Sequence, residues 1–363
     1  VFNRKQLEAF ASGSIVQCFG VDFAALDKRK SPRIPNGRLL LMDRVVEVSG
    51  RRMDILPPAS ITTETDIERD AWFLENNPYG QVPLAVLMEI ALQPCGMLSA
   101  YLGTPLIIPA ENNLFRNLDG WMSLEPFPDL RGKTITSKSQ LIKTIASGGL
   151  YVQQFKFQLL ADDHPFVNGE SAFGYFTQAM MEQQHGLDIA NRKPMLISSV
   201  EEDLHSFVPK IHNRAKLKES PLDLWDQLWI STSGGDNGLG AFAGMRTVQP
   251  NDWFFSNHFY QDPVMPGSLG VEAITRGLAV LAGRISNEAP ISPELDLAYD
   301  QPLRWKYRGQ VLPTNQQTYF EGQVKERRDA NGTTRISADA NFWADGIRIY
   351  SIENLSMILK EKL

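Results

Sequence analysis

The stretch from Trp253 to Gly283, WFFSNHFYQDPVMPGSLGVEAITRGLAVLAG, decides how the rest of the chain is interpreted. It places His258 in an aromatic run, then breaks the chain at a proline-glycine turn. Beyond Ser268 the apolar residues recur at intervals of three and four, which is typical of a helix. Glu272 lies inside that apolar pattern, where a carboxylate is unfavourable unless it has a partner or a chemical role. The histidine and the carboxylate together indicate an active-site segment.

The same pattern occurs earlier in the chain, which indicates an internal repeat. The word DAWFLENN aligns with NDWFFSNH, so that Asn77 matches His258. VPLAVLMEIALQPCG then aligns with VMPGSLGVEAITRGL, which places Glu89 opposite Glu272. Each copy is predicted to contain strands, one apolar helix and a run of antiparallel strands. We therefore expect an α+β fold in which each helix is enclosed by a sheet.

The repeat also predicts the domain organisation. Residues 1–35 are expected to form a helical lead-in, with helices over Arg4–Ala11 and Val16–Leu26, that ends in the turn-forming run SPRIPNG. Residues 36–185 would form the first copy and residues 203–363 the second, joined by a linker at residues 186–202.

Strands and turns follow from alternation and from turn residues. We expect strands at Leu39–Val46, around Ile61, and at Thr134–Thr144, Leu150–Leu160, Glu170–Ala179, Leu222–Trp229, Ala241–Val248 and Ile336–Phe342. Tight turns are expected at Gly148-Gly149, Asn168-Gly169 and Asn331-Gly332. The glycine-rich run Gly234–Gly240 is interpreted as a hairpin rather than a phosphate loop, because a strand follows it.

Composition limits the function classes. The net charge of −6 and the pI near 5.5 argue against a nucleic-acid or anionic-membrane partner. Two cysteines, Cys18 and Cys95, are too few for a disulfide framework, so a reducing, cytoplasmic compartment is expected. The chain begins at Val1 rather than at methionine, which suggests a domain of a longer multidomain enzyme.

The apolar stretch Val82–Ala110 is long enough to be mistaken for a membrane span. It contains Glu89 and Gln93, its prolines include Pro94, and its flanks show no basic bias. An apolar helix wrapped by a sheet explains it better, so no membrane span is expected. Pro94 is expected to kink this helix just after Gln93.

The two copies differ in their polar residues. Only the second copy has the histidine, and the helix of the first copy carries Glu89 and Gln93 four residues apart on one face. If the copies pack face to face as homodimers do, His258 meets Glu89 and Gln93. The other composite site would hold their counterparts, Asn77, Glu272 and Arg276. That second site lacks a base, so one working site is expected.

The segment HFYQDPVMPGSLGVEA resembles the active-site segment of hotdog-fold 3-hydroxyacyl-ACP dehydratases of bacterial fatty acid synthesis. In that family a catalytic histidine precedes a DPVMPG turn, and an acidic residue lies fourteen positions after it, as Glu272 follows His258. The two-copy arrangement resembles the dehydratase didomains of polyunsaturated-fatty-acid synthases and related iterative polyketide-type megasynthases. The resemblance covers nearly all of the chain from about Leu39, and the HF-x-x-DPVMPG word is specific.

This resemblance implies a double-hotdog fold, with the two copies packed as a pseudo-dimer. It also implies a substrate carried on the phosphopantetheine of an acyl carrier protein, neighbouring synthase domains as partners, and no further cofactor. Association into a homodimer stays open. Glutamate stands where the isomerising branch of the family has aspartate, and Ser268 stands where that branch has cysteine, so isomerase activity is not implied.

Dehydration requires a base for the C2 proton and an acid for the departing C3 hydroxyl. We assign His258 as the base, because imidazole titrates near neutrality. Glu89 is the candidate acid, since burial should raise its pKa, and Gln93 would hold it. The resemblance places the backbone N–H of Gly267 at the thioester oxygen, where a helix start favours negative charge. Pro266 and Phe259 complete the expected substrate-binding set.

Two other functions stay open. A hotdog thioesterase would use a helix carboxylate to activate water, but leaves His258 and the Pro266-Gly267 turn without a role. A non-catalytic docking module for an acyl carrier protein is the other alternative. The five histidines show no metal-ligand spacing, so no metal is expected. Alternating Arg304, Lys306 and Arg308 are interpreted first as a solvated strand face, and otherwise as a contact for a phosphate or an acidic carrier.

Overall fold

The structure is a computed structural model, and it describes residues 1–74, 82–188, 194, 221–222, 224–285, 295–298, 301–330 and 332–360. The chain divides into two compact units. Unit 1 contains Val1–Arg69, Val86–Gln184 and Asn251–Met265, and unit 2 contains Asp70–Ala85, His185–Pro250 and Pro266–Leu363. Each unit thus includes one short segment from the other half of the chain. The continuous boundaries expected from the repeat are a different division and stay a prediction.

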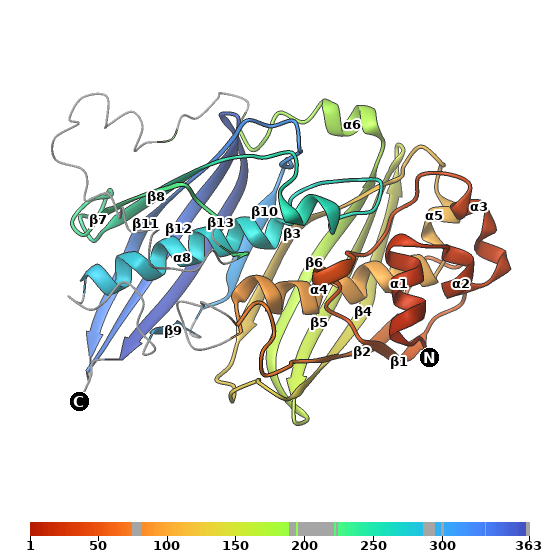
Figure 1. Ribbon diagram of the computed structural model, residues 1–363, viewed down its shortest axis with the longest axis horizontal. Coiled ribbons are helices and arrows are strands. Elements are labelled where there is room, and N and C mark those ends of the chain that lie inside the picture. The colour runs from red at the N-terminus through yellow and green to blue at the C-terminus, as the bar shows by residue number, and fades with distance from the viewer. Residues whose placement is uncertain are drawn as a thin grey trace. The chain divides into compact units, whose positions relative to one another are not determined.

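Unit 1 contains one antiparallel sheet in the order β1-β2-β4-β5-β6-β3 (Figure 1). Its strands are β1 (Arg44–Ser49), β2 (Ala59–Asp66), β3 (Leu114–Leu124), β4 (Thr134–Ser147), β5 (Leu150–Ala161) and β6 (His164–Phe176). Its helical elements are α1 (Arg4–Ser12), α2 (Ile15–Phe19), η1 (Val21–Phe23), α3 (Ala24–Asp27), η2 (Gly37–Leu39), most of α4 (Leu84–Tyr101), α5 (Thr104–Ile107), α6 (Gln178–Glu182) and η4 (Trp253–Ser256).

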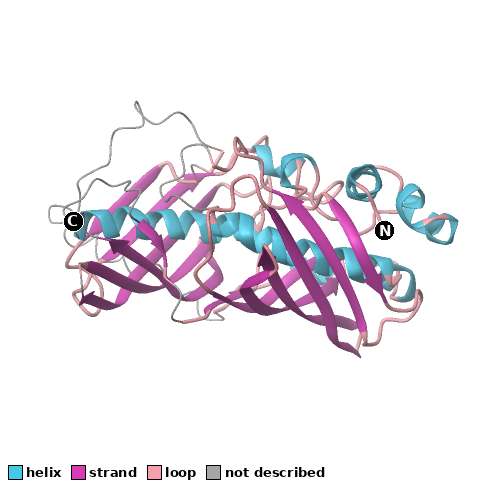
Figure 2. Cartoon of the chain, turned by 90° about the horizontal axis from the view of Figure 1, so that it is seen from below, coloured by secondary structure: helices cyan, strands magenta, loops and turns pink. Residues whose placement is uncertain are grey.

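Unit 2 contains a second antiparallel sheet in the order β7-β8-β11-β12-β13-β10, with β9 paired to β13. Its elements are β7 (Gln227–Ser231), β8 (Ala241–Thr247), α8 (Gly267–Ile285), β9 (Leu295–Leu297), β10 (Leu303–Tyr307), β11 (Gln317–Ala330), β12 (Thr333–Ala344) and β13 (Ile347–Lys360). The long helix α8 packs against β7, β8, β11, β12 and β13. Figure 2 shows a long helix lying along the strands of a sheet.

The two sheets have the same topology. Taken in chain order within each unit, the six main strands lie in the order first, second, fourth, fifth, sixth, third. In both units a long apolar helix stands between the second and third of these strands. The expected α+β fold, two hotdogs each built from an antiparallel sheet and one enclosed helix, is confirmed. Their packing as a pseudo-dimer stays a prediction.

The lead-in belongs to the core of unit 1. The helix α1 starts with a capping box between Asn3 and Gln6, and it buries Leu7 and Phe10. These apolar residues pack with Phe19 and with sheet residues of unit 1 in one continuous core. The helix expected over Val16–Leu26 is broken into α2, η1 and α3 at Gly20, where a φ of 97° suits glycine.

The helix α4 passes through the position of Pro94 without a break in its assignment, so the expected kink stays a prediction. The helix α4 is long and apolar enough to cross a membrane, yet 83% of its 18 residues, Leu84–Tyr101, are buried inside the protein. Cys95 and Leu98 of α4 belong to the same hydrophobic core of unit 1 as Phe155 of β5. This burial matches the expected sheet-wrapped helix.

Three strands begin at other residues than predicted. The strand expected at Glu170–Ala179 is part of β6, which begins at His164 and ends at Phe176. The strand expected at Leu39–Val46 begins only at Arg44. Side chains form hydrogen bonds with the backbone before Arg44 instead. Gln93 donates to the Leu39 carbonyl and accepts from the Leu41 N–H, and the Thr65 hydroxyl donates to the Leu41 carbonyl. Likewise, β7 begins at Gln227 rather than at Leu222, although Leu222 and Leu224 are buried.

The turns were predicted with mixed success. Gly148-Gly149 connects β4 and β5 with φ of 57° and 81°, as expected, and the glycine-rich run forms the β7–β8 connection. Asn168-Gly169 lies inside β6, which corrects the predicted hairpin there; the reversal is at Asp162-Asp163, with φ of 50° and 62°. Gly169 is needed for packing, since a Cβ would lie 2.3 Å from the Phe157 ring. Asn331 lies outside the described residues.

Candidate active site

His258 stands on a turn that the backbone fixes on both sides. After η4, the His258 N–H donates to the Phe254 carbonyl at 2.8 Å, and the Val264 N–H donates to the His258 carbonyl at 2.7 Å. The imidazole Nδ1 lies 2.9 Å from the Val264 carbonyl oxygen. Because a carbonyl oxygen only accepts, Nδ1 must carry the proton in this contact. The lone pair of the neutral ring is then on Nε2, as a general base requires.

Burial lowers the pKa of His258 well below its ordinary value. The charge of Arg116 lowers this pKa further, while the Val264 carbonyl and Asp262 oppose the shift. The ring is neutral at pH 7, which is the form that can accept a proton.

Asp262 anchors the segment after the histidine. Arg116 of β3 binds its carboxylate with two hydrogen bonds of 2.7 and 3.0 Å, and Lys30 adds an ion pair at 3.3 Å. Burial alone would raise the pKa of Asp262, but the hydrogen bonds and charges of Arg116 and Lys30 lower it overall. Phe259 and Asp262 also exchange backbone hydrogen bonds of 3.0 and 3.1 Å. Two cations from distant parts of unit 1 therefore fix this turn.

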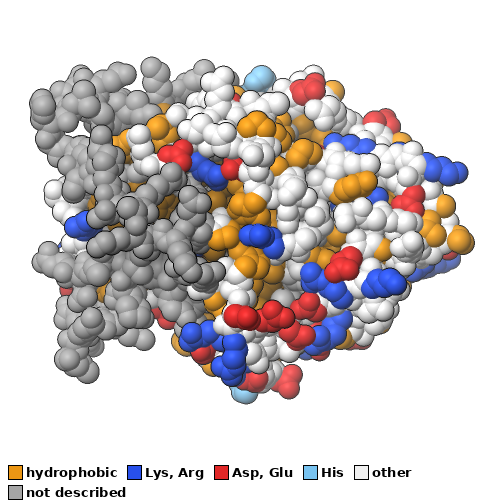
Figure 3. Space-filling view, in the orientation of Figure 1, with side chains coloured by type: hydrophobic (Ala, Val, Ile, Leu, Met, Phe, Trp, Pro, Cys, Tyr) orange, Lys and Arg blue, Asp and Glu red, His pale blue; other side chains and the backbone are white. Residues whose placement is uncertain are grey.

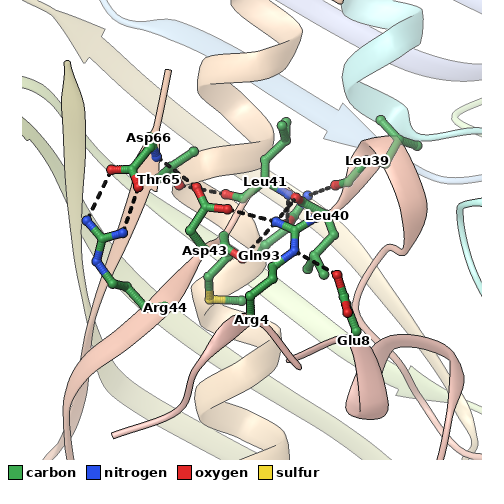
Figure 4. A network of polar contacts seen from close by, with 11 residues as sticks. Arg4, Glu8, Leu39, Leu40, Leu41, Asp43, Arg44, Thr65, Asp66 and Gln93 are labelled. Carbon is green, nitrogen blue, oxygen red and sulfur yellow. Dashed lines mark hydrogen bonds and ion pairs between the residues drawn. The ribbon is translucent and has the colours of Figure 1, made fainter. Parts of the chain in front are cut away.

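Glu89 and Gln93 lie together on α4, as their spacing predicted. Both are buried, with 8% and 5% exposure, and the Gln93 amide donates to Glu89 Oε2 at 2.9 Å. The same amide donates to the Leu39 carbonyl at 2.7 Å, and its oxygen accepts from the Leu41 N–H at 3.0 Å (Figure 4). Gln93 is thus fixed by backbone and presents one N–H to the glutamate.

The structure groups the predicted base and acid in one unit. His258, from the second half of the chain, is in unit 1 with Glu89, Gln93 and Phe259. The Phe259 ring lies against the imidazole at a tilt of 33°, with ring centroids 3.6 Å apart. Pro266 and Gly267 are in unit 2, where Gly267 is the first residue of α8. Its N–H is therefore one of the amides at a helix start, where an oxygen with negative charge is stabilised.

The counterpart site in unit 2 has different contacts. Glu272 is fully buried and forms an ion pair with Arg276, with Oε1 and Nε 3.0 Å apart. Its other oxygen accepts a hydrogen bond of 3.3 Å from the Ala85 N–H in the first turn of α4. Asn77, expected to face Glu272, lies outside the described residues, although the segment Asp70–Ala85 that contains it belongs to unit 2.

Other sequence candidates have simpler explanations. Arg304 and Lys306 of β10 are exposed, and Arg304 stands opposite Glu353 on β13, as on a solvated strand face. Acidic and basic side chains are interspersed over the described part of the face in Figure 3. Among the described residues, no group of three His, Cys, Asp or Glu side chains could hold a metal ion. His205 and His212 lie outside the described residues.

Four residues near His258 were not assigned a role from the sequence. Asp262 stands in the DPVMPG word, but its partners Arg116 and Lys30 come from positions far away in the chain. Asn257 precedes His258 and binds residues near position 37. Pairings over such separations leave no periodic signal in one sequence.

Comparison with known proteins identifies similar sequences. A family model described as a FabA-like domain matches residues 217–353. The chain is 32% identical over 375 residues to one of the polyunsaturated fatty acid synthase subunits of Thraustochytrium sp.. This match covers 95% of the chain but 25% of the relative, so the chain spans about a quarter of that protein. The match over residues 217–353 identifies a FabA-like domain in the second half of the chain, as the sequence motif implied.

The solved structures that resemble the chain are more distant. The dehydratase domain from the CurF module of curacin polyketide synthase is 13% identical, with a TM-score of 0.41, covering 90% of this chain and all of that one. A putative thioesterase from Novosphingobium aromaticivorans is 10% identical, with a TM-score of 0.45, covering 87% of this chain and 98% of the other. Neither likeness bears on activity.

Proposed function

We propose that the chain is a dehydratase domain that converts 3-hydroxyacyl-ACP thioesters to 2-enoyl-ACP during chain elongation in a multidomain synthase. The observation that carries the proposal is the grouping of His258 in unit 1 with Glu89 of α4, although the two residues come from different halves of the chain. The domain would act in the cytoplasm, with an acyl carrier protein and neighbouring synthase domains as partners.

In the proposed reaction, His258 Nε2 removes the proton from C2 and Glu89 gives a proton to the C3 hydroxyl, which leaves as water. The electrons of the broken C2–H bond form the C2=C3 double bond as the C3–O bond breaks. Imidazolium and carboxylate result, and a proton passing from His258 to Glu89 restores both groups. The Gly267 N–H would stabilise negative charge on the thioester oxygen. The chemistry needs no cofactor beyond the phosphopantetheine arm that carries the substrate.

Several features support this assignment of roles. The contact from Nδ1 to the Val264 carbonyl orients the ring, and the lowered pKa keeps it neutral. The amide of Gln93 fixes the Glu89 carboxyl in a buried position. A thioesterase would need a carboxylate and water, and it would leave the oriented imidazole without a function.

The test is to incubate the chain with a 3-hydroxyacyl-pantetheine thioester and to measure product masses. Dehydration gives a product lighter by one water. Hydrolysis would give free acid and thiol, and an unchanged thioester would indicate docking alone; either result overturns the proposal. His258→Ala should abolish dehydration, whereas Asn77→Ala should largely spare it.

A further inference from the structure

Residues 36–41, which we term the strap, bind the residue next to the candidate base. The Asn36 N–H donates to the Asn257 carbonyl at 2.8 Å, and the Arg38 N–H donates to Asn257 Oδ1 at 3.0 Å. The guanidinium of Arg38 also lies over the Trp253 ring, 5.4 Å from its centroid. All of these residues are in unit 1. One end of the strap is therefore hydrogen-bonded to the turn that carries His258.

Asn257 connects the strap to the backbone of this turn. Its Nδ2 donates to the Trp253 carbonyl at 3.1 Å, and its backbone N–H donates to the Phe254 carbonyl at 3.1 Å. The next residue, His258, bonds to the same Phe254 carbonyl. A shift of the Asn257 side chain would therefore move the backbone that carries the imidazole.

The other end of the strap binds the residue that holds the candidate acid. Leu39 and Leu41 provide the carbonyl and the N–H that fix both ends of the Gln93 amide (Figure 4). The Thr65 hydroxyl of β2 donates to the Leu41 carbonyl at 2.7 Å. Because Gln93 then donates to Glu89, one short segment is bonded towards both candidate catalytic groups.

The lead-in helix braces the strap from outside. Arg4 of α1 donates to the Leu40 carbonyl at 2.9 Å and to the Met42 carbonyl at 3.3 Å (Figure 4). Its guanidinium also pairs with Asp43 at 3.0 Å. These bonds explain why the lead-in is packed into unit 1.

We propose that the strap is a positioning element, which sets the placement of His258 relative to Glu89. This inference deepens the proposed function and rests on it for its catalytic consequence. Proton transfer from carbon needs close alignment, and a displacement of about 1 Å can reduce the rate about a hundredfold. Asn257 and Gly37 are positioning residues, because they act through the turn rather than on substrate.

Gly37 offers a sharp test. Its φ is +56°, and a Cβ there would lie 2.5 Å from Asn257 Oδ1. Gly148, in the β4–β5 hairpin of the same unit, has a φ of +57° with nothing within 4 Å of its Cβ position. Both alanine variants carry a similar backbone strain, but only Gly37→Ala displaces Asn257. Gly148→Ala is therefore a matched control.

The experiment compares wild type, Gly37→Ala and Gly148→Ala as the full chain, with the same 3-hydroxyacyl-pantetheine substrate. Gly37→Ala should lower kcat by about tenfold or more with little change in KM, while Gly148→Ala keeps the wild-type kcat. Both should lose some Tm through backbone strain, and Gly37→Ala should lose more, because it also disturbs the hydrogen bonds of the Asn257 side chain. Adding Gly37→Ala to Asn257→Ala should not lower kcat further, because the side chain that Gly37→Ala displaces is already absent.

A second readout does not depend on activity. The His258 ring, followed by NMR during a pH titration, should titrate nearer its ordinary pKa in Gly37→Ala, because a displaced turn is less buried, and should be unchanged in Gly148→Ala. An unchanged His258 titration, or equal kcat in the two folded variants, would overturn the inference. If wild type fails to dehydrate but the titration still moves, the proposed function fails and the link between strap and histidine stands.

Discussion

The helices α4 and α8 carry a glutamate at corresponding positions, but its partner four residues later differs. Glu89 is held by the neutral amide of Gln93, whose remaining groups are bonded to backbone. Glu272 is in a buried ion pair with Arg276 and also caps the start of α4. An amide can orient a carboxyl group for proton transfer, whereas a guanidinium engages the carboxylate in a charge-assisted bond. Under the proposed function, the same position serves chemistry in one helix and structure in the other.

The helices also differ in how closely the sheet approaches. In unit 2 a Cβ at Gly277 would lie 2.8 Å from the Phe242 ring, and one at Gly270 would lie 2.6 Å from the Tyr350 ring. In unit 1 a Cβ at Gly96 would be 3.5 Å from the Phe115 ring, which is an ordinary contact. Aromatic side chains therefore press directly on the backbone of α8.

The largest expected effect is on activity. Glu89→Gln should reduce kcat by about 10²- to 10⁴-fold, since an amide cannot give a proton to the leaving hydroxyl. Glu272→Gln, measured as kcat per folded molecule, should stay within a few-fold of wild type. Steady-state kinetics with the thioester substrate checks both variants. Dependence on Glu272 instead of Glu89 would break the comparison.

The second effect is on stability, and here the larger loss is expected in α8 rather than in α4. Arg276→Met should lower the free energy of unfolding by about 3–5 kcal/mol, because it leaves the Glu272 carboxylate buried without its cation. Urea denaturation followed by circular dichroism measures the loss. Replacing both partners, as Glu272→Leu with Arg276→Met, should recover much of it. A loss equal for the single and double variants would argue against a buried ion pair.

A smaller effect on stability is expected from glycine substitutions in the two helices. Gly277→Ala should destabilise the protein by about 1–3 kcal/mol, because the added methyl group overlaps the Phe242 ring. Gly96→Ala should be neutral or stabilising by up to about 1 kcal/mol, since alanine is the better helix former and has room. Thermal unfolding of the pair is the measurement, and equal shifts in Tm would contradict the difference in packing.

The smallest effect is a pH dependence of stability and of kcat/KM that comes from His258 in unit 1. The pKa of His258 is lowered in the folded state, so the unfolded chain binds its proton more readily. Stability from this group is present above the unfolded pKa near 6.5 and is lost as pH falls from there towards the folded pKa. The acidic limb of kcat/KM should likewise lie below pH 6.5. His258→Gln should remove this part of the stability profile, and an acidic limb above 6.5 would contradict the shift.

The sequence predicted the features that repeat or alternate. The matching of Glu89 with Glu272 identified both helices, and the alternation in β5 and β12 identified half-buried strands. Periodic patterns of this kind are set by local geometry and are visible in one chain. The type of fold followed from them.

Features that depend on side chains from distant positions could not be predicted. The strand expected at Leu39 begins late because Gln93, over fifty residues away, takes its backbone groups. The pairing of Arg116 with Asp262 spans 146 positions. Asn168-Gly169 has the composition of a turn, but Gly169 is required by the Phe157 ring. In each case a tertiary contact overrides the local signal.

The interleaving of the chain has a consequence for engineering and for evolution. Because Asn251–Met265 is in unit 1 and Asp70–Ala85 is in unit 2, no single cut separates one hotdog from the other. A fragment ending at residue 185 would carry Glu89 but no His258, and its complement would carry the histidine without α4. The two copies must therefore be inherited, expressed and transplanted as one module, even though their topologies are alike.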